Sequence, residues 1–262
     1  GVLCEHASYK NMINNFRVFD SHTHVGHGLH HGRRYSGDQL LAAMDEHGVE
    51  RSLVIPFPVV ADHYETHNEI ARAVKAHPDR LVGAACIYPY IGKEKYRDEV
   101  KRCAEELGFR ALKLQPQFQP LDPLLEVGDF LYEAAIEFNL PIVIHTGSGV
   151  PYSLPSLYIM PAKRFPEAKI VLAHCGGGGL FFGEAIIAAM TCENIWLELS
   201  TLLPHQILLV LKHVKASRLM VGSDLPENVE AELTKIINLE VADEIKQDIL
   251  WNTACHLFGE GC

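Results

Sequence analysis

The 262-residue sequence lacks any apolar run that approaches the ~20 residues needed to cross a bilayer. It is also poor in basic residues, since 23 lysines and arginines stand against 33 aspartates and glutamates and give a formal net charge of −10. An acidic balance disfavours non-specific binding to nucleic acid or to anionic membranes. We therefore expect neither as a partner. The expected partner is a small-molecule substrate, and assembly into a homo-oligomer is left open.

Paired cysteines are missing as well. Seven cysteines are scattered along the chain without a CxxC pair or a disulfide-like spacing. An odd number in a chain of this length indicates reduced thiols. The first fifteen residues also lack an apolar core of signal-peptide length. These features predict a cytoplasmic protein.

Short apolar runs alternate with amphipathic stretches, and no linker or change of composition divides the chain. We count eight expected strands, at Phe16–Phe19, Arg51–Pro56, Leu81–Ile87, Arg110–Leu114, Ile142–His145, Ile170–His174, Ile195–Leu199 and Leu219–Gly222. Each precedes a helical segment, so the pattern favours an α/β fold: a single-domain (β/α)8 TIM barrel. A doubly wound open sheet is the alternative. It would be expected to carry a phosphate-binding glycine fingerprint, and the sequence contains neither GxGxxG nor a Walker motif.

The domain prediction is an N-terminal extension over residues 1–15 and a barrel over residues 16–262. Capping-box pairs at Ser36/Gln39 and Thr66/Glu69 predict two helix starts. A final amphipathic helix, Ala242–Phe258, is expected to close the chain.

Metal-capable residues stand at the ends of the expected strands, where TIM barrels carry their active sites. His22 and His24 share one face of a strand because side chains alternate, and Asp20 lies on the same face. Asp20 could orient a ligand histidine or accept from the local backbone. Later strands contribute three more such residues, His145, His174 and Asp224, and the strand Arg110–Leu114 carries Lys113.

Imidazole and carboxylate are ligands that borderline divalent metals such as zinc prefer. A catalytic ion lowers the pKa of a bound water, and a nearby carboxylate or imidazole can then move protons. The inventory of strand-end residues therefore predicts a metal centre with a hydrolytic role.

Six motifs, DSHTHVG, KLQP, VIHTG, LAHCGG, GSDLP and NTACHLFG, together resemble the amidohydrolase superfamily. The resemblance is to its amidohydrolase-2 branch, which includes aminocarboxymuconate-semialdehyde decarboxylase-like enzymes, and it spans about Phe16 to Gly259. It implies a TIM barrel with a divalent metal, most often Zn²⁺. The implied metal ligands are His22, His24, His145 and Asp224.

The resemblance leaves the roles of two residues open. His174 corresponds to a partner of the metal-activated water in mononuclear members and to a ligand of a second ion in binuclear ones. Lys113 corresponds to a lysine that is carboxylated in some binuclear members, and otherwise contacts the substrate or an ion-pair partner. Gln115 stands where many relatives have a substrate-facing histidine, which weakens the transfer of any particular specificity.

The loop after the first strand is rich in histidine and arginine. It is interpreted either as a lid that contacts substrate or as a solvated loop. Within it, Arg34 is the residue favoured for gripping a substrate carboxylate.

These observations predict a metal-dependent hydrolase that uses a metal-activated water on an amide, lactone or related small-molecule bond. Asp224 and His174 are the predicted catalytic residues, with one ion and a second left open. Two alternatives remain: a metal-dependent non-oxidative decarboxylase of a small carboxylic acid, and a non-catalytic metal-binding barrel.

Overall fold

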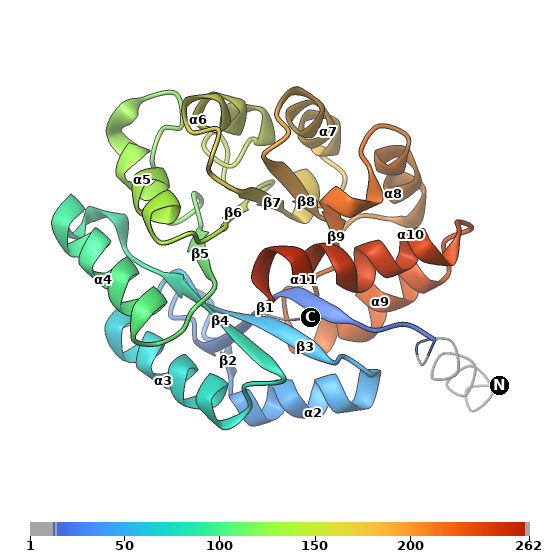
Figure 1. Ribbon diagram of the computed structural model, residues 1–262, viewed down its shortest axis with the longest axis horizontal. Coiled ribbons are helices and arrows are strands. Elements are labelled where there is room, and N and C mark those ends of the chain that lie inside the picture. Colours follow the sequence, from blue (N-terminus) through green and yellow to red (C-terminus); the bar gives the residue numbers. More distant parts are fainter. Residues whose placement is uncertain (1–12, 14, 260–262) are drawn as a thin grey trace.

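Eight parallel strands, paired in chain order, lie at the centre of the molecule (Figure 1). The structure, a computed structural model, describes residue 13 and residues 15–259. The parallel strands are β1 (Phe19–His27), β3 (Arg51–Pro56), β4 (Leu81–Cys86), β5 (Ala111–Leu114), β6 (Ile142–His145), β7 (Ile170–Ala173), β8 (Ile195–Glu198) and β9 (Leu219–Met220).

The first and last of these strands are joined, which closes the sheet. Thr23 and Asp224 form a parallel bridge. Nearby, the Ser21 amide donates to the Val221 carbonyl at 3.0 Å. The sheet is therefore a (β/α)8 barrel, as predicted, and the doubly wound alternative is wrong because an open sheet would leave both edge strands unpaired.

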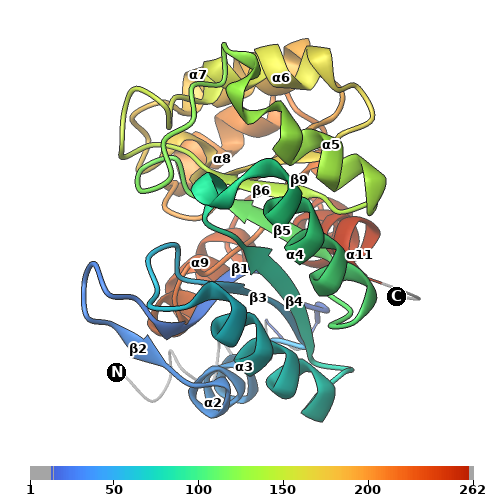
Figure 2. The same ribbon diagram turned by 90° about the vertical axis from the view of Figure 1, so that its left-hand side faces the viewer.

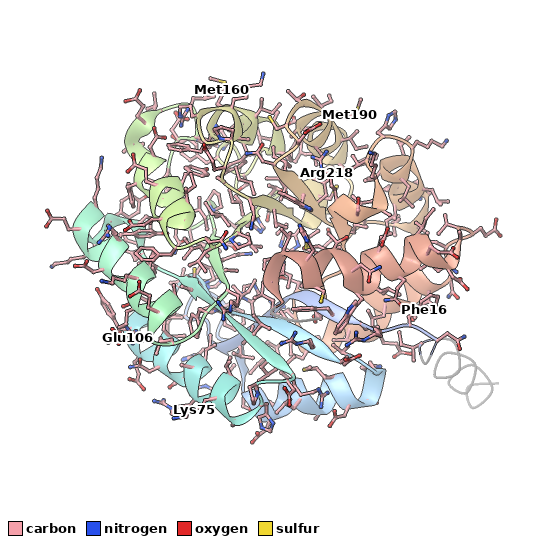
Figure 3. All side chains as sticks on the ribbon, in the orientation of Figure 1. Phe16, Lys75, Glu106, Met160, Met190 and Arg218 are labelled. Atoms are coloured by element: carbon pink, nitrogen blue, oxygen red, sulfur yellow. The ribbon has the colours of Figure 1, made fainter. Side chains whose placement is uncertain are left out.

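Helices surround the barrel and bury their apolar faces against the outside of the strands (Figure 1). They are α2 (Gly37–His47), α3 (His63–Ala76), α4 (Lys93–Glu105), α5 (Asp129–Glu137), α6 (Ile159–Arg164), α7 (Phe182–Thr191), α8 (Pro204–Leu211), α9 (Val229–Ile237), α10 (Asp243–Gln247) and α11 (Thr253–Phe258). Side chains fill both the interior of the ring and the layer between strands and helices (Figure 3).

The C-terminal helix plugs one end of the barrel. Trp251 and Phe258 pack against Phe19 inside it, with ring centroids 5.9 and 6.4 Å apart. The short strand β2 (Arg34–Tyr35) lies on the opposite side (Figure 2). The carboxyl ends of the strands are therefore left as the end that can hold a site.

Several predicted boundaries are wrong for local reasons. The first strand covers Phe19–His27 instead of Phe16–Phe19, so His22 and His24 lie inside it. The loop after His24 contains a ninth strand, β2, antiparallel to β1. The predicted final helix contains a π-helical turn over Asp248–Asn252.

The two helix-start predictions had different outcomes. Ser36 and Gln39 form the predicted capping box at α2. The second prediction is wrong, because Asp62, not Thr66, caps α3 by accepting from the amides of Tyr64 and Glu65. A carboxylate one turn earlier satisfies the free amides and extends the helix.

Four cysteines, Cys86, Cys103, Cys175 and Cys192, are free and buried. Cys255 is disulfide-bonded, contrary to the expectation of reduced thiols. The predicted extension over residues 1–15 lies almost entirely outside the described residues. No helix within the described residues combines the length and the apolar character needed to cross a membrane.

Candidate metal centre

β1 directs two imidazoles into the barrel mouth with their Nε2 atoms 3.2 Å apart. In His22, Nδ1–H donates to the Glu198 carboxylate at 3.1 Å. In His24, Nδ1–H donates to the carbonyls of Ile55 and Pro56 at 3.1 and 3.2 Å. Because Nδ1 carries the proton in both rings, both Nε2 atoms present lone pairs.

β6 and β7 bring in two further imidazoles. The Nε2–H of His145 donates to the Ser148 carbonyl at 2.9 Å, and its buried Nδ1 has no hydrogen-bond partner among the described residues. The Nδ1–H of His174 donates to the Ser200 hydroxyl at 2.7 Å, which leaves Nε2 as an acceptor. The His174 ring lies 5.0 Å from that of His145 and 4.9 Å from that of His22.

The Asp224 carboxylate completes the cluster. Its Oδ1 lies 3.6 Å from Nε2 of both His22 and His24, and 3.9 Å from Nε2 of His174. The side chain is 32 % exposed, whereas the imidazoles are nearly covered. Asp224 and His174 both have left-handed backbone conformations, with φ of 65° and 64°. Such strain in residues other than glycine is concentrated at functional sites.

Lys113, on β5, lies beside the histidine cluster. Its buried Nζ donates to Nε2 of His22 at 3.0 Å. Burial lowers the pKa of Lys113 to about 8, because the charged form loses its hydration. The structure therefore places Lys113 beside a predicted ligand rather than in the wall of the pocket above it.

The histidines are neutral at pH 7. Burial lowers the pKa of His145 to about 3 and that of His174 to about 4, and it holds the pKa values of His22 and His24 well below the ordinary one. Neutral imidazole is the form that binds metal.

The donor set fits a divalent ion. Two nitrogens on a tetrahedral zinc lie about 3.3 Å apart, which is close to the 3.2 Å between His22 and His24. Two facing lone pairs repel each other unless a cation lies between them. His22, His174 and Asp224 also bring one ligand atom each within 4.8 Å of one another.

Two buried carboxylates support this cluster. Asp20 accepts from the amides of His22 and Ser223 and from the Ser223 hydroxyl, so it clamps backbone and does not touch an imidazole. Burial raises the pKa of Asp20 to about 7. Sequence reasoning missed Glu198. The available signal was a lone carboxylate at the end of the apolar strand IWLE.

A pocket of about 290 Å³ opens above the cluster. His24, His145, His174 and Asp224 form part of its lining, and the loop after β1 contributes His30, His31 and Arg33. Phe57 stacks on His24 at 5.0 Å, and Phe118 lies 4.4 Å from His30. Arg34 instead faces a neighbouring hollow, where its guanidinium donates to Nδ1 of His27 at 3.1 Å.

A second buried cluster lies between α3 and α4. His67 donates from Nδ1–H to Glu99 at 2.6 Å and accepts the Cys86 amide at Nε2 at 3.0 Å. Arg102 pairs with the same carboxylate at 2.7 Å, and Cys103 lies beside it. The Glu99 carboxylate is neutralised by Arg102, and His67 joins it to the Cys86 amide, which makes this cluster a structural link.

A closed (β/α)8 barrel with histidines and an aspartate converging at its strand ends is the architecture of the metal-dependent TIM-barrel enzymes. The family model described as amidohydrolase matches residues 19–259. The chain belongs to the amidohydrolase family, which confirms the predicted resemblance.

Several solved structures share the fold. A 5-carboxyvanillate decarboxylase from Novosphingobium aromaticivorans, complexed with manganese and 4-hydroxy-3-methoxy-5-nitrobenzoic acid, has a TM-score of 0.75 at 15% identity, covering 93% of this chain and 96% of that one. A 2,6-dihydroxybenzoate decarboxylase from Rhizobium gives 0.75 at 15% identity, with 93% and 98% covered. A 4-oxalomesaconate hydratase from Rhodopseudomonas palustris gives 0.71 at 18% identity, with 92% and 95% covered. At these identities the similarity establishes the barrel fold.

Proposed function

We propose that the protein is a divalent-metal-dependent hydrolase that cleaves an amide, lactone or related bond of a small molecule. His22, His24, His145 and Asp224 would hold the ion through the atoms described above, and Zn²⁺ suits this donor set. When bound, such an ion supplies Lewis acidity that polarises a substrate oxygen and acidifies water. A second ion would need the help of Lys113, which lies 3.0 Å from His22 and would have to be carboxylated.

The position of the Asp224 carboxylate carries this proposal. Its Oδ1 lies within 3.9 Å of three imidazole nitrogens, and its side chain also reaches the open pocket. Asp224 can therefore accept the proton of an attacking water and pass it to the leaving group. The Nε2 atom of His174 faces the same space and can orient that water.

The test measures whether turnover depends on metal and whether oxygen from water enters the product. The purified protein, chelated and then reloaded with Zn²⁺ or Mn²⁺, is assayed on a panel of small lactones and amides in ¹⁸O-labelled water. We expect metal-dependent turnover with one label incorporated per product. Full turnover by metal-free protein would contradict the proposal.

A second candidate, non-oxidative decarboxylation of a small carboxylic acid, is favoured by the wall of the pocket. Arg33 and the aromatic side chains Phe57 and Phe118 line it, which suits a planar carboxylate. Two of the similar structures are decarboxylases of 5-carboxyvanillate and 2,6-dihydroxybenzoate. Release of CO₂ without incorporation of labelled water would support this candidate over hydrolysis.

Two adjacent arginines, Arg33 and Arg34, serve as test and control for the recognition of a substrate carboxylate. Arg33 lines the pocket, whereas Arg34 faces the neighbouring hollow. For a carboxylate substrate, Arg33→Ala should raise KM by about 10- to 100-fold, the equivalent of losing a charge-assisted hydrogen bond. Arg34→Ala should leave KM unchanged. Equal effects of the two variants would count against recognition of a carboxylate by Arg33.

A further inference from the structure

Glu198 ends β8 beneath the histidines, and its side chain is completely buried. Its Oε2 accepts from Nδ1 of His22 at 3.1 Å, from the His174 amide at 3.0 Å and from the Ser200 hydroxyl at 2.9 Å. Its Oε1 accepts from the Ser200 amide at 2.6 Å. All four partners are donors, so the site is built for an ionised carboxylate.

Through Ser200 the same carboxylate also controls His174. The Ser200 hydroxyl has one proton, and it is donated to Glu198. The hydroxyl oxygen must then accept from Nδ1 of His174, 2.7 Å away. Glu198 therefore keeps the proton on Nδ1 in His22 directly and in His174 through one hydroxyl, and it turns both Nε2 lone pairs toward the cluster.

Gly222 leaves room for this arrangement because it has no side chain. A Cβ atom at Gly222 would lie 2.7 Å from Oε1 of Glu198 and 2.7 Å from Cβ of His22. Both distances are far below van der Waals contact. Glycine at this position allows the carboxylate and the ligand histidine to meet.

We propose that Glu198 is a positioning residue that sets the tautomers of His22 and His174 together, so that one buried carboxylate governs both ion binding and proton handling. The part that concerns the ion rests on the proposed function. The part that concerns the tautomers rests on the hydrogen bonds alone.

The variant Glu198→Gln tests the proposal, because an amide offers one acceptor oxygen and brings an NH₂ group against donors. Zinc affinity of the folded, metal-free protein is measured by competition with a chromogenic chelator. We expect affinity to fall 10- to 100-fold, as when the outer partner of a metal-binding histidine is removed. In parallel, ¹⁵N NMR of the imidazoles should show that His22 and His174 lose their uniform Nδ1–H form.

The matched control is Glu232→Gln. Glu232, on α9, accepts from the Thr201 amide at 3.0 Å and pairs with Lys235. This variant should bind zinc as the wild type does. A folded Glu198→Gln protein with wild-type affinity and wild-type tautomers would overturn the proposal.

A second variant covers the case in which Glu198→Gln does not fold. Ser200→Ala cuts only the route to His174, so His174 should lose the Nδ1–H signature while His22 keeps it. An unchanged His174 signature would overturn the proposal. If the wild-type protein binds no zinc, the proposed function fails, and the NMR readout still decides the role of Glu198.

Discussion

Two buried clusters of histidine and carboxylate can be compared within this one chain. At the barrel mouth, acceptor atoms of His22, His24, His174 and Asp224 face one another, with the Lys113 amine as a donor and the His145 ring beside them. Between α3 and α4, His67 and Glu99 meet donor to acceptor, and Arg102 completes the charge balance. A carboxylate neutralised by a guanidinium is a structural link, whereas a carboxylate that lies within 3.9 Å of three imidazole nitrogens forms a candidate ligand site.

Ionisation differs between the clusters for the same reason. Burial alone would raise the pKa of Glu99, but hydrogen bonds from Arg102 and His67 outweigh it and bring the pKa to about 2. In His145, burial dominates and lowers the pKa to about 3. A partner of opposite charge decides whether a buried group stays ionised.

The largest expected contrast is in turnover. Asp224→Asn should lower kcat by about 10²- to 10⁴-fold, since it removes the proposed proton acceptor at the mouth. Glu99→Gln should change kcat by less than about threefold when assayed where it is folded, because Glu99 is remote from the pocket. Steady-state kinetics of the metal-loaded variants measures both. Similar losses in the two variants would remove the functional distinction between the clusters.

For the free energy of unfolding, a substitution in the second cluster should have the larger effect and a substitution at the barrel mouth the smaller one. In metal-free protein, His67→Ala should lower the free energy of unfolding by about 3 kcal/mol, since it leaves a buried carboxylate short of a donor. His24→Ala should cost less, because it relieves the facing lone pairs. Denaturant titration measures these free energies of unfolding, with and without zinc.

Zinc at 100 times its Kd should add about 2.7 kcal/mol to the free energy of unfolding of wild type and of His67→Ala. The same gain in His24→Ala would argue against His24 as a ligand.

Acid should weaken the ion pair of the second cluster, and comparison with Glu99→Gln isolates this part of the pH dependence. The folded-state pKa of Glu99, about 2, lies below its ordinary value of 4.5. The contribution of Glu99 to stability is therefore fully present above pH 4.5 and is lost as the pH falls toward 2. Unfolding free energies of metal-free wild type and Glu99→Gln, measured across this range, should converge at low pH. A constant difference between them would contradict the assigned ion pair.

The smallest expected effect concerns the thiol of the second cluster. Cys103 Sγ lies 3.5 Å from both His67 Nδ1 and Glu99 Oε1. Cys103→Ala should cost about 1 kcal/mol, the worth of a weak hydrogen bond. Elemental analysis should find the same zinc content as in wild type. Loss of one ion per chain would show that this cluster does bind metal.

Much of the fold could be predicted from the sequence, because eight βα units and strand-end polar residues are local patterns. The ranges of β4, β5 and β6 were predicted within one residue, and His145 lies at its predicted strand end. The full length of β1 could not be predicted, since its polar run DSHTH is stabilised by pairing with β3 and by the bridge to Asp224. Likewise, Arg33 and Arg34 are neighbours in sequence, yet they line different hollows, because Arg34 begins strand β2 and Arg33 lies in the loop before it.

The residue types that reach the barrel mouth follow from local patterns, because side chains alternate along strands and strands alternate with helices. What those residues can do follows from contacts made in the folded chain. Whether a buried histidine offers a lone pair depends on the partner of its other nitrogen. That partner can lie anywhere in the chain: Glu198 is 176 residues from His22, and Glu99 is 32 from His67. The tautomer, and with it the difference between a ligand and a structural link, is a property of contacts that exist only after folding.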